Sequence, residues 1–230
     1  MQATELRVLA GGGIAVPLKE IAAQFETASD HKVTIHFGTT PELIKLATSG
    51  VSFDLVVVPQ DVMQDAGARA QFAPEPTPNV ARVGFGIAVR CGARKPGINT
   101  SAALKQTLLA AQSIASIPAS AAGTQLAAIY AQLGILDEMT AKIRAQPTPA
   151  HIIDAVANGQ AELGVFLLNV LTDPRLDVVG PFPTEVQREV VYQAGVATST
   201  TVPDAAKAFI DYLLSPAAAT VIRTNGMTPG

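Results

Sequence analysis

The first sixty residues alternate between strand and helix patterns, and this alternation constrains the fold more than any other feature. Apolar residues recur at every second position from Leu6 to Ala10 and from Val33 to Phe37, as in half-buried strands. Helical spacing runs from Leu18 to Phe25, and Phe53 to Val58 is a nearly continuous apolar run. The order β-α-β-α-β predicts an α/β fold with a mostly parallel sheet and helices on its faces.

A second α/β series follows a proline-rich break at residues 74–78. The expected later elements are strands at 82–90, 113–117, 163–168 and 189–197, and helices at 101–111, 123–133, 149–158, 203–214 and 217–223. We interpret the strands at 82–90 and 189–197 as the two connections between two lobes. We therefore expect one lobe from residues 1–81 and 195–230, a second from residues 82–194, and a ligand cleft between them.

Composition excludes several classes of protein. The chain is 48% hydrophobic and 15% charged, with a net charge of −3 and no basic run, so nucleic acid and anionic membranes are not expected partners. No uninterrupted apolar run reaches about 18 residues, so no membrane-spanning helix is expected. The start at Met1-Gln2-Ala3-Thr4 fits two interpretations, a cytoplasmic protein or a mature exported chain with an added Met.

Cysteine and histidine usage gives no sign of a metal or a cofactor. Cys91 is the single cysteine, which excludes an internal disulfide, and we interpret it as buried or incidental. His31, His36 and His151 do not have the spacing of a ligand set. We expect His31 at the surface and His151 at a helix start, where capping and catalysis are both open.

Three consecutive glycines, Gly11, Gly12 and Gly13, stand between the first strand and the first helix. They do not form a dinucleotide loop, because Val16 occupies the third glycine position, and no Gly-Lys-Ser/Thr follows. The run Gly84 to Val89 is not a dinucleotide loop either, because Val89 occupies its third glycine position. A helix start nevertheless presents unpaired N–H groups and a positive dipole end, which bind small anions. A tight β-α turn is the alternative.

Small or hydroxyl residues recur at three further helix starts. These are Thr39-Thr40 with Thr40 as the candidate N-cap, Ser120 to Thr124, and Thr148 to His151. Four such starts, two in each lobe, favour several helix dipoles converging on one anionic ligand, although each has an ordinary capping explanation. The candidate donors are Gly11, Gly12, Gly13, Thr39, Thr40, Ala122, Gly123, Thr124, Ala150 and His151.

The sequence resembles the bacterial periplasmic molybdate-binding proteins of ABC importers, which have the type II periplasmic binding protein fold. The matching stretches are "VLAGGGIAVPLKEIAAQFE", "VTIHFGTTPELIKLATSG", "FDLVVVP", "ANGQAELGVF" and "AFIDYLLSPAAATVI", in family order over nearly the whole chain. The resemblance implies a periplasmic solute-binding protein with an importer membrane component as its partner. It also implies a tetrahedral oxyanion held by serine hydroxyls and backbone N–H groups.

The resemblance carries over only in part. The family's first serine position matches Gly12, and the second falls at Thr39 or Thr40. The backbone donors of the second lobe fall near Ala122 and His151. The family's cleft tyrosine corresponds to about Leu167. One hydroxyl and one phenol are therefore absent here, which leaves the ligand open between an oxyanion and a small carboxylate.

Two functions are consistent with these residues. A solute-binding protein would recognise its ligand without bond chemistry, and Arg82, on the crossing strand with Arg90, is the candidate carboxylate clamp. Aconitate isomerase, an enzyme similar in fold to molybdate-binding proteins, suggests an isomerase of a small unsaturated polycarboxylate. Its candidate catalytic groups are Thr40, His151 and Glu185. A regulatory ligand-sensing domain is a third interpretation.

Overall fold

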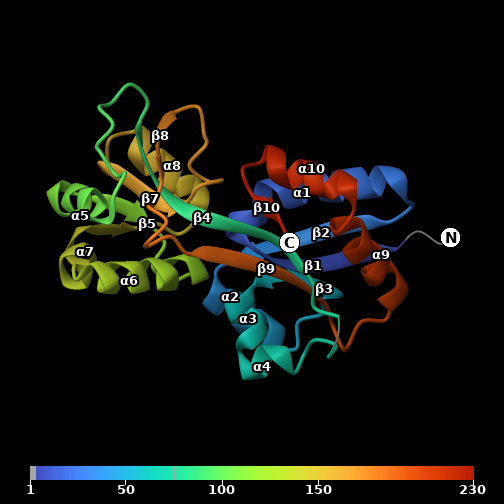
Figure 1. Cartoon of the computed structure of the whole chain (residues 1–230). Coiled ribbons are helices and arrows are strands. Elements are labelled where there is room, and N and C mark those ends of the chain that lie inside the picture. Colours follow the sequence, from blue (N-terminus) through green and yellow to red (C-terminus); the bar gives the residue numbers. More distant parts are fainter. Residues whose placement is uncertain (1–3, 75) are drawn as a thin grey trace. The chain divides into compact units, whose positions relative to one another are not determined.

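The computed structural model describes residues 4–74 and 76–230, and the chain divides into two compact units (Figure 1). Unit 1 comprises Met1–Arg82 and Val191–Gly230, and unit 2 comprises Val83–Val190. Strands β4 (Asn79–Arg90) and β9 (Glu189–Val196) each pass from one unit into the other. The two interpretations of Met1 to Ala3 concern residues outside the described part of the chain.

Unit 1 is built on a sheet with the order β2-β1-β3-β9, followed by the beginning of β4. Strand β1 (Glu5–Gly11) pairs in parallel with β2 (Lys32–Gly38) and β3 (Leu55–Pro59). Strand β9 is antiparallel to β3, and the short β10 (Thr228–Pro229) is antiparallel to β4. The predicted β-α-β-α-β order is confirmed, and the returning strand adds an antiparallel edge to it.

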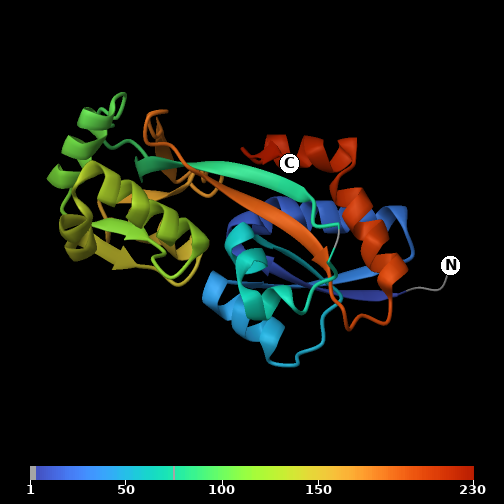
Figure 2. The same ribbon diagram turned by 60° about the horizontal axis from the view of Figure 1, so that its bottom comes forward.

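Helices cover both faces of the unit 1 sheet. One face carries α1 (Ala15–Ala28), α9 (Pro203–Leu213) and α10 (Pro216–Thr224), and the other carries α2 (Thr40–Thr48), α3 (Gln60–Gln64) and α4 (Ala66–Arg69). Figure 2 brings the second group in front of the strands.

Aromatic residues mark the core on both faces. Under α1, the Phe25 ring packs against Phe209, with ring centroids 5.0 Å apart. On the α2 face, Phe53 and Phe72 meet edge to face at 6.1 Å. The apolar spacing of these elements is therefore explained by burial against the sheet.

Unit 2 has the sheet order β4-β7-β5-β6, with β8 (Leu176–Pro181) beside β4. Strand β5 (Ile114–Ser116) is parallel to β6 (Ile143–Ala145) and β7 (Leu163–Leu167), whereas β4 is antiparallel to β7 and β8. The helices of this unit are α5 (Ser101–Ala110), α6 (Ala121–Leu133), α7 (Leu136–Lys142) and α8 (Pro149–Ala157).

The elements with strong periodicity lie within three residues of their expected bounds, and several short elements were not predicted. These are α3, α4, α7, β6, β8, β10 and the 3₁₀ turn at Gly12–Ile14. Two expected helix starts were wrong. Helix α2 is capped by Thr39 and not by Thr40, and α6 begins at Ala121 under a Ser120 cap and not at Gly123.

Membrane-spanning length was tested over the described residues. No single helix there is both long enough and apolar enough to cross a bilayer, and α9 with α10 meets the criterion only as a pair bent by 57°.

Candidate functional site

The carboxyl ends of β1, β2 and β3 form one edge of the parallel sheet in unit 1. Gly11 pairs with Gly38 at this edge, and Pro59 pairs with Tyr192 of β9. Helices α1, α2 and α3 begin from here, α1 after a single 3₁₀ turn at Gly12–Ile14. Ligands of open α/β sheets bind outside the carboxyl ends of strands, so this edge is the candidate site of unit 1.

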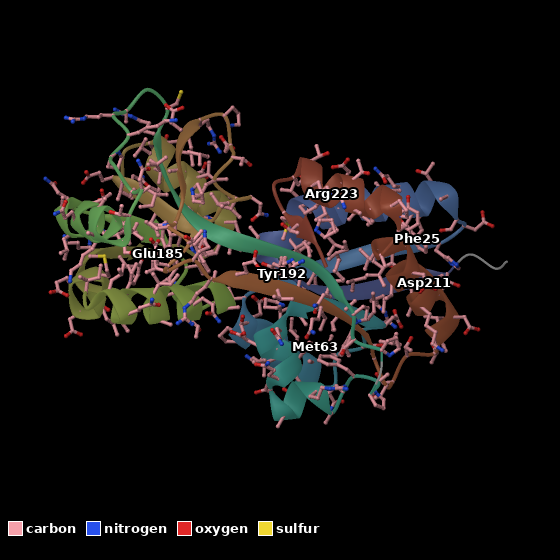
Figure 3. All side chains as sticks on the ribbon, in the orientation of Figure 1. Phe25, Met63, Glu185, Tyr192, Asp211 and Arg223 are labelled. Atoms are coloured by element: carbon pink, nitrogen blue, oxygen red, sulfur yellow. The ribbon has the colours of Figure 1, made fainter. Side chains whose placement is uncertain are left out.

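Gly11 is required here by packing. Its φ of −69° is open to any residue, but a Cβ atom on Gly11 would lie 2.8 Å from Tyr192 Cε1 and 3.0 Å from Pro59 Cδ. The Tyr192 ring is buried against this edge (Figure 3), and burial raises the pKa of its phenol. Gly12 and Gly13 lie in the half-buried 3₁₀ turn that follows.

The carboxylate of Glu42 lies at the start of α2. The Thr39 hydroxyl accepts a hydrogen bond from the Glu42 N–H, and the Thr39 N–H donates to Glu42 Oε2 at 3.4 Å, which completes a capping box. Glu42 Oε1 lies 3.1 Å from His36 Nε2. The hydroxyl of Thr39 is thus committed to the helix, and Thr40 is the first helical residue.

The carboxyl ends of β5 and β6 form the corresponding edge in unit 2. Ser116 pairs with Ala145 across these parallel strands, and the Gln146 N–H donates to Ser116 O at 2.8 Å. Helices α6 and α8 follow β5 and β6, so both helix starts lie at one edge. The buried Leu167 ends the neighbouring strand β7 opposite Phe85, and its side chain offers no donor.

The start of α6 has a neutral cap and no acidic residue in its first turn. Ser120 Oγ accepts from the Gly123 N–H at 3.0 Å and donates to Ile117 O at 2.7 Å. A Cβ atom on Gly123 would lie 2.2 Å from Pro118 O, so this glycine permits the tight turn. Ala122 is buried and stands before Thr124, whose N–H makes the first intrahelical bond, to Ser120 O at 3.0 Å. The Thr124 hydroxyl also bonds to Ser120 O, at 3.3 Å.

The side chains of Thr148 and His151 contact each other at the start of α8. Thr148 Oγ1 lies 2.7 Å from His151 Nδ1, and the His151 N–H donates to Thr148 O at 3.1 Å. Ala150 and the His151 side chain are exposed. Thr148 makes no side-chain capping hydrogen bond to the backbone, so the role of His151 stays a prediction.

Arg82 is paired with β10, and Glu185 lies apart from the α6 start. Arg82 is exposed in β4, opposite Thr228 of β10. Glu185 is exposed, and its backbone oxygen accepts from Gln132 Nε2 at 3.3 Å, beside the carboxyl-terminal half of α6 (Figure 3). Gln132 is eleven positions after Ala121, which is a rise of about 16 Å. Within unit 2, Glu185 is therefore far from the α6 start.

Two residues that sequence reasoning missed lie at or near these edges, and they are Asp61 and Arg188. Asp61 stands in the first turn of α3, two positions after Pro59, and burial raises the pKa of its half-buried carboxyl. An acid just beyond a buried strand was a usable signal. Gln187 and Arg188 contact Phe85 and Gln125, 102 and 63 positions away, and no local pattern predicts such pairs.

One expectation about a single residue was wrong, and one was narrowed. Cys91 is exposed, which excludes the buried alternative and leaves the incidental one. His31 is only 5% exposed and stacks on Phe25, with ring centroids 5.8 Å apart. Among residues 4–74 and 76–230, no group of three or more His, Cys, Asp or Glu side chains could hold a metal ion.

Comparison with known proteins assigns the fold and then the family. The Azotobacter vinelandii periplasmic molybdate-binding protein superposes with a TM-score of 0.79, over 98% of this chain and 99% of that one, at 21% identity. The structure is therefore an α/β periplasmic binding protein fold, as the sequence predicted. The family model of bacterial extracellular solute-binding proteins matches residues 6–228, and the chain belongs to that family.

Two curated relatives have different printed functions. An aconitate isomerase from a Pseudomonas species is 34% identical over 234 residues, which cover 98% of this chain and 88% of the relative. The molybdate-binding protein ModA of Azotobacter vinelandii is 28% identical, with coverage of 98% and 90%. The chain is thus similar both to a protein named as a binding protein and to one named as an enzyme.

Proposed function

We propose that this protein is a solute-binding protein for a small carboxylate anion, and that the α6 start of unit 2 supplies donors to it. The observation that carries the proposal is this start, where the Ala122 N–H lies beyond a parallel-sheet edge and no acidic residue stands in the first turn. Such a start stabilises an anion through the helix dipole and the N–H groups of the first turn.

The residues at two positions favour a carboxylate over a tetrahedral oxyanion. By resemblance, the molybdate-binding family places a hydroxyl at the position of Gly12 and a phenol near Leu167. Glycine offers no side-chain donor, and Leu167 is a buried aliphatic residue. The 34% identical relative is named for a reaction of a tricarboxylate, which supports the same ligand class.

The setting of this function follows from the family. Extracellular solute-binding proteins capture a ligand outside the cytoplasm. We therefore propose a periplasmic location and an ABC importer membrane component as the partner. Growth on the identified ligand as a carbon source, with and without the gene, tests the transport role. Equal growth would count against it.

A thermal-shift panel tests the ligand class. Molybdate, tungstate, sulfate and phosphate are compared with citrate, cis- and trans-aconitate, malate and citraconate. A ligand present at 100 times its dissociation constant should stabilise the protein by about 2.7 kcal/mol. We expect a shift with at least one polycarboxylate. A shift with molybdate or tungstate alone would overturn the carboxylate assignment.

Thr40, at the first position of α2, tests the use of that helix start. Thr40→Val should weaken anion binding and leave the fold intact. Thr48→Val is the matched control, because Thr48 lies in the same helix and its hydroxyl bonds to Ile44 O at 2.8 Å. Equal affinities of the two variants would remove Thr40 from the site.

The aconitate isomerase relative supports a second candidate function, an isomerase of an unsaturated polycarboxylate. A base would take a proton from the allylic carbon, the double bond would shift, and a proton would return at the far end of the allylic system. The raised pKa of Asp61 suits a proton acceptor better than the distant Glu185. Chromatography of cis-aconitate incubated with protein tests it, and trans-aconitate formation lost in Asp61→Asn would support it.

A further inference from the structure

The Gln187 side chain binds the segment before β9 to strand β4. The Phe85 N–H donates to Gln187 Oε1 at 2.9 Å, and Gln187 Nε2 donates to Phe85 O at 2.9 Å. The Phe182 N–H donates to the same carbonyl at 3.0 Å, and the Gln187 N–H closes a turn onto Pro183 O at 2.9 Å. This double contact fixes the backbone that carries the next residue, Arg188.

Arg188 lies beside the amino-terminal half of α6. Its Nη1 donates to Gln125 Oε1 at 3.4 Å, and its N–H donates to Gln187 Oε1 at 3.2 Å. Gln125 is the fifth residue of α6, a rise of about 6 Å from Ala121. A cation therefore stands within about a turn of the acid-free helix start.

Arg188 is exposed and, like Arg82 and Arg94, has no carboxylate partner among the described residues, whereas Arg175 and Arg7 each have at least one. Arg175 binds Asp154 at 2.8 Å and Asp173 at 2.9 Å, and Arg7 lies 3.6 Å from Asp54. The Gln125 oxygen accepts from Arg188 and keeps a second lone pair, whereas every other polar group of the two side chains is an N–H donor. This excess of donors favours an anion.

We propose that Arg188 determines specificity by binding one carboxylate of the ligand through its guanidinium fork, with the Gln125 amide as a second donor. This rests on the proposed function and names the residue that would distinguish a carboxylate from a tetrahedral oxyanion. A planar fork matches a carboxylate in bidentate geometry. The role predicted for Arg82 from sequence passes here to Arg188.

Isothermal titration of the full chain with citrate, trans-aconitate and molybdate tests this role. Arg188→Gln should weaken the better polycarboxylate by about tenfold to a hundredfold, as expected for lost charge-assisted hydrogen bonds. Arg188→Lys should recover part of that loss, because charge is kept without the fork. Gln125→Ala should cost less, and thermal unfolding should show that each variant folds.

Arg94→Gln is the control, because Arg94 is exposed in unit 2 and forms no ion pair within the described residues. It should bind as the unaltered protein does. Unchanged polycarboxylate affinity in Arg188→Gln would overturn the inference alone, as would an equal loss for molybdate. Absence of polycarboxylate binding to the unaltered protein would overturn the proposed function together with this inference.

Discussion

The starts of α2 and α6 occupy equivalent places, each beyond a parallel-sheet edge, but they treat a negative charge in opposite ways. At α2 the Glu42 carboxylate reaches back to the Thr39 N–H and forms a capping box. At α6 the Ser120 hydroxyl caps Gly123, the first turn has no acid, and Arg188 contacts the second turn. Small residues at a helix start therefore do not by themselves indicate an anion-binding site.

This difference separates self-capping from ligand binding. The Glu42 carboxylate repels an anion added at the α2 start, since two like charges repel by about 1–4 kcal/mol at 4 Å depending on local screening. The α6 start lacks that competitor. We therefore expect α6 to contribute more to anion binding than α2.

The largest expected effect concerns the α6 start itself. Gly123→Ala should destabilise the protein by about 3 kcal/mol, because its Cβ would lie 2.2 Å from Pro118 O and 2.4 Å from Ile117 O. Urea unfolding measures this change. Gly97→Ala is the control, since nothing lies within 4 Å of its added Cβ. Equal stability of the two variants would show that the α6 turn relaxes freely.

The next effect tests the competitor at α2. Glu42→Gln keeps the capping side chain but removes its charge, so affinity for a polycarboxylate should rise by about fivefold. Glu42→Ala should also lose about 1 kcal/mol of stability with the capping box. Asp204→Asn, in the first turn of α9, should leave affinity unchanged. Weaker binding in Glu42→Gln would reverse the ranking of the two helix starts.

A smaller effect concerns the pH dependence of unit 1. Burial raises the folded-state pKa of Asp61, so the folded protein binds its proton more tightly than the unfolded chain does. Ionised Asp61 therefore destabilises the folded protein. This destabilisation is absent below the usual aspartate pKa of about 3.9 and is complete above the raised pKa. Asp61→Asn should therefore increase the melting temperature at pH 7.5 and not near pH 3.5. A decrease at pH 7.5 would show that the carboxylate makes stabilising contacts.

The smallest effect is expected at Arg82. Arg82→Ala should change both stability and polycarboxylate affinity little, within about 0.5 kcal/mol, since Arg82 is exposed opposite Thr228. Titration of this variant beside Arg188→Gln compares the two arginines directly. A larger loss of polycarboxylate affinity in Arg82→Ala than in Arg188→Gln would make Arg82 the carboxylate-binding arginine.

Sequence reasoning predicted the elements of the fold because burial imposes a period on residues such as Leu6 to Ala10 and Leu18 to Phe25. It located helix starts but misjudged their caps by one or two residues. The reason is physical: Thr39 and Thr40 have the same chemistry, and only the backbone conformation decides which accepts the Glu42 N–H.

The environment of the site could not be predicted in the same way. The contact of Arg188 with Gln125 joins residues 63 positions apart, and the packing of Gly11 depends on Tyr192. Both depend on tertiary register, which local spacing does not encode. The role of Gly123 likewise became clear only from its approach to Pro118 O.

Proton NMR of trans-aconitate with the protein in D₂O tests the central claim most directly. Saturation transfer from protein to ligand reports binding, and loss of ligand C–H signal by deuterium incorporation reports proton-transfer chemistry. A solute-binding protein for a small carboxylate predicts saturation transfer that citrate competes away, with no deuterium in the ligand. Deuterium incorporation would make the protein an isomerase, and absence of transfer to either polycarboxylate would contradict the carboxylate assignment.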